Sequence, residues 1–241
     1  MSDQETQRNL LDDGIIDVDV GAIIDSYLEE EKERPKRTGA YFPSEIGACI
    51  RRSYYSYLYP QPTAPSALRI FALGNELHAF IAEALKASEE FSRVEDEKPI
   101  RIDYADEETN FSIFGRIDDY VVTKKDNKTI LIEAKSVGDV NKVNEPEKKH
   151  VMQLMLYLKA EAADYGLLVY ADKKNLQIRQ FKVSFSEQAY AKIIERFKDL
   201  DFHLKNKKLP PAEYYFNEEL VWQCKYCPYY DRCMQAIAEG Q

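Results

Sequence analysis

The chain has 241 residues, of which 44% are hydrophobic, which is enough for one large domain or for a core with appended segments. Its net charge of −9 excludes a chain-wide basic footprint for nucleic acid. The first 40 residues hold 11 acidic and 5 basic residues, whereas the rest of the chain holds 31 and 28. Binding of nucleic acid would therefore have to depend on local basic patches and bound metal.

No apolar run approaches the length of a membrane span, and residues 1–13 lack the basic and apolar parts of a signal peptide. We therefore expect a cytoplasmic protein that makes no membrane contact. In a reducing compartment, four cysteines favour a metal site over a disulfide framework. The sequence leaves the oligomeric state open.

The pattern of apolar residues predicts a mixed α/β sheet flanked by helices. After a polar, acidic segment, we expect helices at residues 22–34, 45–59, 67–87, 148–163 and 186–204. We expect strands at residues 91–102, 111–123, 129–136, 165–170 and 176–183. Ser44 is placed to cap the second helix and Ser186 the last.

The segment from Tyr41 to Tyr59 is rich in tyrosine and contains Arg51 and Arg52. These residue types suit stacking on bases and contact with phosphate. Packing of the aromatic rings into the domain explains them equally well, so both readings stay open. The same question applies to the basic loop at 205–208.

The stretch 114–136 contains two short apolar runs separated by a charged turn. Because side chains alternate along a strand, Glu133 and Lys135 are expected to share one face. A hairpin through residues 124–128 would bring Asp118 back beside them. Two carboxylates and an ammonium at one sheet edge are costly to bury unless something binds them, and a divalent metal with a phosphate would do so.

Hydrolysis of a phosphodiester needs an activated water and a neutraliser for the growing charge, and a divalent cation supplies both. Asp118 and Glu133 can be direct ligands, and the carbonyl of Ala134 can be another. Lys135 can orient the water and stabilise the transition state. The buried helix at 148–163 also carries Gln153 and Tyr157 on one face, and buried polar groups need partners.

Four short motifs resemble the RecB-like branch of the PD-(D/E)XK nuclease superfamily in order and spacing. They are Gly74 with His78, Gly115 to Asp118, Glu133 to Lys135, and Gln153 with Tyr157. The resemblance implies that His78, Asp118 and Glu133 bind Mg²⁺ or Mn²⁺ and that Lys135 is catalytic. It implies that Gln153 and Tyr157 position DNA or the catalytic groups. Asp119 should face the opposite side of its strand.

Three cysteines lie close together near the C-terminus and one lies far upstream: Cys49, Cys224, Cys227 and Cys233. From their chemistry alone, four thiolates suit zinc or an iron–sulfur cluster, with zinc the safer choice. The arrangement is similar to that of the iron–sulfur RecB-like nucleases and most like the CRISPR-associated exonucleases of spacer acquisition. That resemblance implies a 4Fe-4S cluster, which would join the two ends of the domain and stabilise the fold.

The resemblance covers residues 41–235, so we expect a nuclease domain at 41–241, preceded by an acidic, partly flexible extension at 1–40. It implies a metal-dependent exonuclease on single-stranded DNA or overhangs, with some endonuclease activity, that trims spacer precursors for the CRISPR integrase. Two alternatives remain at this stage. One is a nuclease of the same branch in DNA repair or viral recombination. The other is a non-catalytic DNA-binding scaffold stapled by zinc.

Overall fold

The computed structural model of the protein describes residues 18–30, 36–215 and 220–240. The chain divides into a small unit, residues 1–33 with 63–72, and a large unit, residues 34–62 with 73–241. In the small unit, helix α2 (Val20–Glu29) forms an ion pair with the start of the next long helix, between Asp25 and Arg69 (2.6 Å). The boundary that the sequence suggested at residue 40 stays a prediction.

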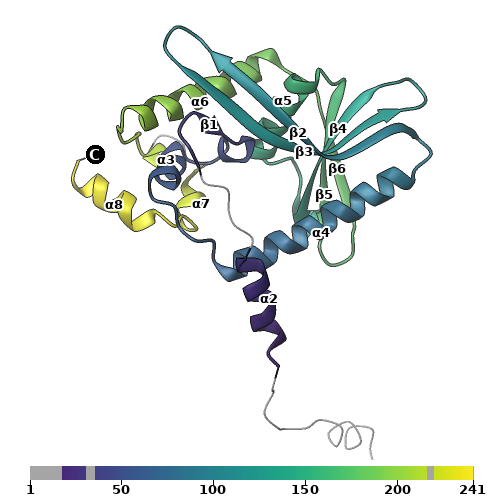
Figure 1. The fold of residues 1–241 in the computed structure, drawn as a ribbon, viewed down its shortest axis with the longest axis horizontal. Coiled ribbons are helices and arrows are strands. Elements are labelled where there is room, and N and C mark those ends of the chain that lie inside the picture. The colour runs from purple at the N-terminus through teal and green to yellow at the C-terminus, as the bar shows by residue number, and fades with distance from the viewer. Residues whose placement is uncertain (1–17, 31–35, 216–219, 241) are drawn as a thin grey trace, which may run out of the picture. The chain divides into compact units, whose positions relative to one another are not determined.

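A six-stranded mixed sheet forms the centre of the large unit (Figure 1). Its strands are β1 (Ala40–Tyr41), β2 (Phe91–Ala105), β3 (Asn110–Thr123), β4 (Thr129–Val137), β5 (Tyr165–Asp172) and β6 (Ile178–Val183). The order is β1-β3-β4-β5-β6, with β2 paired to the other edge of β3. The β1–β3 and β4–β5 pairs are parallel, and the other pairs are antiparallel.

Helices cover both faces of this sheet. On one face, α5 (Lys148–Glu161) and α6 (Glu187–Lys205) lie beside one another and bury the larger core, which includes Leu154, Phe197 and Leu168. On the other face, Leu85 of α4 (Pro65–Ala87) packs on a smaller apolar cluster around Val121. The α/β fold with a flanked mixed sheet, predicted from the sequence, is therefore confirmed.

Most of the predicted elements form within a few residues of their expected bounds. Ser186 caps α6 as expected, since its hydroxyl accepts the backbone N–H of Ala189. The first predicted helix is present as α2, and its expected final residues lie outside the described ranges. The segment between β4 and the next helix contains a short 3₁₀ helix, η2 (Val140–Lys142).

The helix predicted to open at Glu45 is wrong. A 3₁₀ helix, η1 (Pro43–Glu45), is followed by an irregular stretch, and the α-helix α3 (Ile50–Leu58) begins only after Cys49. The carbonyls of Ile46, Gly47 and Ala48 accept hydrogen bonds from side chains distant in sequence instead of from a helical turn. Hydrogen bonds from these distant side chains therefore replace the bonds that a helix would form here.

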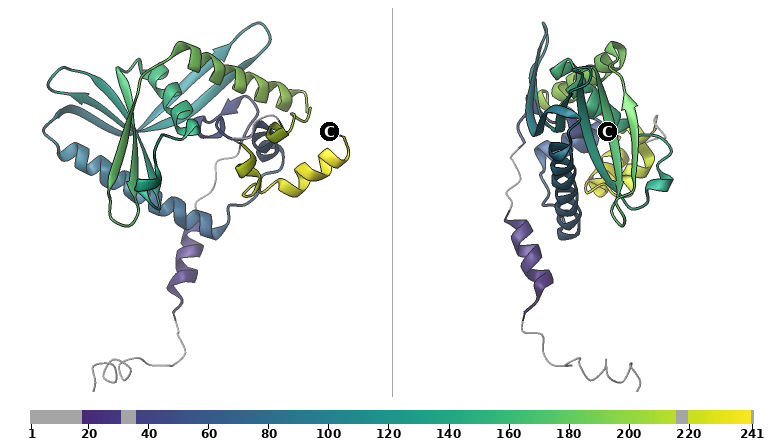
Figure 2. Two further views of the ribbon diagram at one scale, coloured as in Figure 1. Left: turned by 180° about the vertical axis from the view of Figure 1, so that it is seen from behind. Right: turned by 90° about the vertical axis from the view of Figure 1, so that its right-hand side faces the viewer.

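The two ends of the large unit meet in space. The short helices η3 (Glu213–Tyr215), α7 (Val221–Cys224) and α8 (Tyr230–Ala238) end the described chain, and α7 and α8 lie close to α3 in both ribbon views (Figures 1 and 2). The ring of Tyr55 in α3 packs against that of Tyr229, with centroids 5.7 Å apart. Within the described ranges, no helix combines the length and apolar character needed to cross a membrane.

Gly47 allows its segment to approach α5 closely. A Cβ at this position would lie 2.0 Å from the Cβ and 2.6 Å from the Cα of Lys149, so a side chain would force the backbones apart. We predict that Gly47→Ala lowers the free energy of unfolding by about 1–3 kcal/mol, the usual cost of overpacking. Urea denaturation followed by circular dichroism measures this change.

Gly138→Ala is the matched control, because a Cβ there would meet no atom within 4 Å. We expect its free energy of unfolding to stay within about 0.5 kcal/mol of the wild type. Equal stability of the two variants would contradict the close approach of Gly47 to α5.

Candidate active site

The candidate site forms where β3 and β4 separate. Their antiparallel pairing runs from Val122 with Thr129 to Asp119 with Ile132 and then ends. Beyond that point, the carboxylate of Asp118 lies between the strands, and its Oδ2 accepts the backbone N–H of Ala134 (2.8 Å). The predicted hairpin therefore brings Asp118 next to the Glu133–Lys135 segment.

Glu133 is fully buried, and its Oε1 accepts a hydrogen bond from Nζ of Lys135 (2.5 Å). Its second oxygen, Oε2, is one of three buried side-chain oxygens without a hydrogen-bond partner in the described part of the chain. An unpartnered buried carboxylate oxygen is costly, and it is a natural ligand for a cation. As expected, Glu133 and Lys135 lie on the same face of β4.

The electrostatics follow from this burial. Loss of water raises the pKa of Glu133, and the charge on Asp118 raises it further, while Lys135 acts in the opposite direction. Burial alone would lower the pKa of Lys135, but the negative charges on Glu133 and Asp118 together raise it. The lysine is therefore held in its ammonium form at the centre of the site.

His78, on α4, borders the site as the sequence predicted. Its Nδ1 lies 3.7 Å from Oδ1 of Asp118, and its side chain is 26% exposed. One turn earlier, Gly74 faces β4, and a Cβ there would stand 3.8 Å from Oγ of Ser136. Helix α4 thus adds an imidazole beside the carboxylates of the sheet.

Gln153 and Tyr157 line the same region from α5. Both are buried, and Nε2 of Gln153 donates to the hydroxyl of Tyr157 (3.2 Å). Burial raises the pKa of Tyr157, and the charge on Glu133 raises it further, so the ring keeps its proton. A Cβ at Gly115 would lie 2.8 Å from Cε1 of Tyr157, so the glycine provides the space that this ring fills.

The predicted metal ligands are neighbours, but they do not form a closed coordination shell. Among the residues that the structure describes, no three His, Cys, Asp or Glu side chains stand close enough together to hold a metal ion. The free oxygen of Glu133, the carboxylate of Asp118 and the imidazole of His78 are donors of suitable type for Mg²⁺ or Mn²⁺. Side-chain adjustment would be needed for them to reach one ion.

The four cysteines border a single pocket although one of them is distant in sequence. Its lining includes Cys49, Cys224, Cys227 and Cys233. All four are free thiols, and Nη1 of Arg51 donates to Sγ of Cys233 (3.7 Å). A shared pocket and four sulfur donors suit a tetrathiolate centre, although the sulfurs are not at ligand distance in the described chain.

Two basic groups considered for DNA contact have internal roles. Arg51 is only 2% exposed, and its Nε donates to the carbonyl of Pro210 (2.7 Å). Lys205 forms an ion pair with the buried carboxylate of Asp201 (2.7 Å). Of the two readings left open for Arg51, the structure favours packing inside the domain, because the side chain is buried in the lining of the cysteine pocket.

Sequence reasoning missed the side chains that hold the backbone around Cys49. These are Arg196, Glu213 and Gln223, which belong to α6, η3 and α7. No motif marks them, since their partners are backbone groups more than 140 positions away. The only signal was the proximity of Gln223 to the cysteine cluster.

Asp119 faces the side of the sheet opposite Asp118, as strand alternation predicted. It is 1% exposed, and its Oδ1 has no hydrogen-bond partner in the described chain. Burial raises its pKa to about 7, and the charges on Asp118 and Asp96 add to this effect. The charged form of Asp119 is therefore disfavoured, and its side chain lies on the face of the sheet opposite Asp118.

The geometry agrees with comparisons to known proteins. Residues 13–234 match the sequence pattern of the PD-(D/E)XK nuclease superfamily. The chain is 28% identical over 211 residues to the CRISPR-associated exonuclease Cas4 of Saccharolobus solfataricus, covering 83% of this chain and 90% of that protein.

Two solved structures share the fold. The crystal structure of SSO0001 superposes with a TM-score of 0.64 at 25% identity, covering 88% of this chain and 94% of that one. An alkaline exonuclease from Laribacter hongkongensis superposes with a TM-score of 0.51 at 16% identity, covering 71% of this chain and 91% of that one. The second likeness concerns the fold alone.

The burial of Asp119 predicts a pH-dependent gain in stability on neutralisation. Its folded pKa of about 7 lies above the unfolded value of 3.8, so the wild type is penalised increasingly as pH rises from 4 to 7. We predict that Asp119→Asn raises the free energy of unfolding by about 2–4 kcal/mol at pH 8 and by little near pH 4. Urea titrations across this range, with a chelator present, measure the difference.

Asp103 is the matched control, because it lies on β2 with an exposed carboxylate. The hydrogen bond that it accepts from Ser112 lowers its pKa, so the charged form is favoured. Asp103→Asn should bring no gain at pH 8. A gain from Asp119→Asn that is the same at pH 4 and pH 8 would contradict the assigned cause.

Proposed function

Because this chain belongs to the PD-(D/E)XK nuclease superfamily, we propose that it is a divalent-metal-dependent exonuclease acting mainly on single-stranded DNA or overhangs. Its reaction is hydrolysis of phosphodiester bonds at the site between β3, β4, α4 and α5. The observation that carries the proposal is the buried carboxylate of Glu133, which lies beside Asp118, bonds Lys135 and keeps one oxygen free. A scaffold would have no use for such a costly group.

The residues that would hold Mg²⁺ or Mn²⁺ are His78, Asp118 and Glu133, together with the carbonyl of Ala134. The ion would supply charge neutralisation and a more acidic bound water. The backbone N–H of Ala134 fixes the carboxylate of Asp118, and the ammonium of Lys135 fixes Glu133. The chain therefore orients its acidic groups by its own hydrogen bonds.

Lys135 is the proposed catalytic residue. The side chain of Lys135 is 23% exposed, whereas that of its partner Glu133 is fully enclosed, so the lysine is the member of the pair that substrate can reach. A cation there can hold a water for attack and stabilise negative charge on the phosphate. The proton on Tyr157 and the amide of Gln153 provide neutral donors that can position the DNA backbone.

The four cysteines are proposed to bind a 4Fe-4S cluster, with Zn²⁺ as the second choice. The support is their shared pocket, together with the hydrogen bond that Arg51 donates to Sγ of Cys233. A centre with one ligand on the N-terminal side and three near the C-terminus would hold the two ends of the domain together. This role is structural and needs no redox step.

For the biological role, we propose trimming of spacer precursors in CRISPR adaptation, in association with the integrase complex. The support is the 28% identity to a CRISPR-associated exonuclease over most of both chains. A cytoplasmic place of action is part of this proposal.

Replacement of Lys135 tests the catalytic assignment. We expect Lys135→Ala to reduce digestion of end-labelled single strands by about 100-fold or more in Mn²⁺, because removal of one charge-stabilising donor costs at least that much. Lys128→Ala is the control, since Lys128 lies at the turn of the same hairpin and forms its ion pair with Asp126 of that turn. Equal rates for Lys135→Ala and the wild type would overturn the assignment.

Metal analysis tests the cysteine centre. After anaerobic purification, we expect a brown protein with iron and sulfide in equal amounts, as a 4Fe-4S cluster requires. Cys227→Ser should lose most of both, because a tetrathiolate site keeps no redundant ligand. A colourless wild type with one zinc per chain would replace the iron–sulfur assignment by the zinc one.

A further inference from the structure

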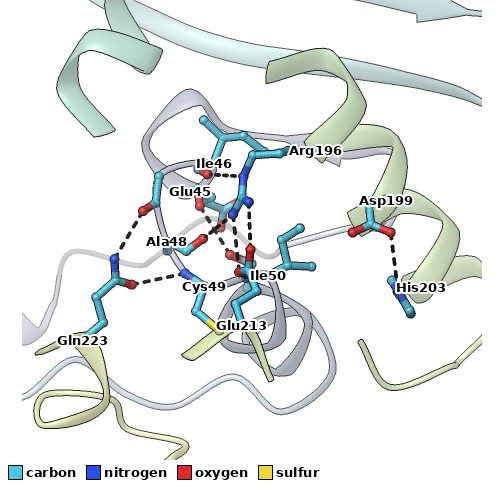
Figure 3. Close-up of polar contacts among 12 residues, drawn as sticks. Glu45, Ile46, Ala48, Cys49, Ile50, Arg196, Asp199, His203, Glu213 and Gln223 are labelled. Carbon is cyan, nitrogen blue, oxygen red and sulfur yellow. Dashed lines mark hydrogen bonds and ion pairs between the residues drawn. The ribbon is translucent and has the colours of Figure 1, made fainter. Parts of the chain in front are cut away.

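The backbone that carries Cys49 is held by side chains from three distant elements. Gln223 spans it, since its Oε1 accepts the N–H of Cys49 (3.1 Å) and its Nε2 donates to the carbonyl of Gly47 (3.3 Å) (Figure 3). Gln223 and Cys49 are 174 positions apart in the sequence. Because Gln223 directly precedes Cys224, the same residue links the segments of two cysteines.

Arg196 and Glu213 complete the contact. Nε of Arg196 donates to the carbonyl of Ile46 (3.1 Å), and its Nη2 donates to that of Ala48 (3.0 Å). Oε2 of Glu213 accepts the N–H of Ile50 (2.5 Å), and its Oε1 pairs with Nη1 of Arg196 (2.8 Å) (Figure 3). Three consecutive carbonyls and two consecutive N–H groups are thereby bonded.

Two of the three side chains that form these bonds are buried, and the third is partly buried. Glu213 is 6% and Gln223 is 7% exposed, and the side chain of Arg196 is 27% exposed. Leaving a buried backbone group unpaired costs about 1–3 kcal/mol, so the segment cannot leave this position without a penalty. The position of Cys49 is therefore fixed by protein groups alone.

We propose that Arg196, Glu213 and Gln223 act as a Cys49 clamp, a set of positioning residues that places this cysteine at the four-cysteine pocket before a metal centre forms. The inference rests on the proposed four-cysteine metal site and adds to it the residues that make its remote ligand available. The clamp residues touch backbone groups and none of them is itself a metal ligand.

The physical advantage is preorganisation. A ligand separated from its partners by most of the chain must lose conformational freedom when the centre assembles, and that loss weakens binding. The clamp brings about this ordering during folding, so less of it remains when metal binds. Groups that orient ligands commonly change metal affinity by about 10–100-fold.

The first measurement uses the metal-free full-length chain. Amide hydrogen exchange is followed at Cys49 and Ile50, whose N–H groups bond Gln223 and Glu213. Gln223→Met removes both of its bonds at similar side-chain volume, and Glu213→Ala removes the acceptor of Ile50. We expect exchange about tenfold faster at the amide that loses its acceptor, which corresponds to about 1.4 kcal/mol.

The second measurement follows the metal centre. Iron and sulfide contents are determined after anaerobic reconstitution, and cluster loss in a chelator is followed by visible absorption. We expect both variants to lose the cluster about tenfold faster than the wild type. Glu161→Ala is the matched control, since Glu161 forms a half-buried ion pair with Lys98 (2.6 Å) away from the cysteines.

The outcomes separate the two claims. Exchange at Cys49 and Ile50 that is unchanged in both variants would overturn the clamp. Faster exchange with wild-type cluster retention would overturn its positioning role, as would equally fast cluster loss in Glu161→Ala. A wild type that binds neither iron–sulfur nor zinc would overturn the four-cysteine site of the proposed function, and the exchange rates would still decide whether the clamp holds this segment.

Discussion

The burial of a charged carboxylate at Glu133 is the constraint on which the active region depends. A fully enclosed carboxylate is costly unless it is paired and hydrogen-bonded. The fold provides Lys135 for one oxygen, two positions further along β4, and leaves the other oxygen free. The charge on the neighbouring Asp118 raises the pKa of Glu133, and the imidazole of His78 lies 3.7 Å from the carboxylate of Asp118. Under the proposed function, this local cost in stability is what makes a cation-binding oxygen available.

Helix α5 encloses that carboxylate, and close contacts through glycine set its position. Leu154 packs directly over Gly166 of β5, where a Cβ would lie 2.6 Å from Cδ2 of the leucine. Gly115 of β3 allows Tyr157 to approach in the same way, and Gly47 brings the segment before α3 against the start of the helix. Each close approach removes space that water would otherwise fill. The helix therefore shields the site while presenting two polar groups to it.

The sequence predicts the parts of this arrangement that depend on local periodicity. The hairpin from β3 to β4 follows from two apolar runs around a charged turn, and it brings Asp118 to the Glu133–Lys135 segment as expected. Because side chains alternate between the two faces of a strand, Asp118 and Asp119 also lie on opposite faces, as expected. The order of four short motifs was enough to identify the superfamily, because spacing and secondary structure constrain one another.

The predictions that failed depend on contacts between distant segments. A helix from Glu45 is locally reasonable, since Ser44 is a good cap. It is replaced by irregular chain because Arg196 and Gln223 bond its carbonyls, and no local rule signals them. The sequence leaves the role of Arg51 open for the same reason, since its burial beside the cysteines cannot be seen in the residues around it. Local patterns specify elements, whereas charged side chains with distant backbone partners decide where an element stops.

The segment from Pro43 to Ile50 lies between the two proposed metal sites and belongs to both. At one end, Pro43 shares with Tyr157 the space beside Gly115, where a Cβ would lie 3.0 Å from Cγ of the proline. At the other end, the clamp holds Cys49 and Ile50 against α6, η3 and α7. A shift of the cysteine region would be transmitted along a few residues of bonded backbone to the helix that covers Glu133. The proposed cysteine centre would thus support catalysis through packing alone, without contributing an atom to the reaction.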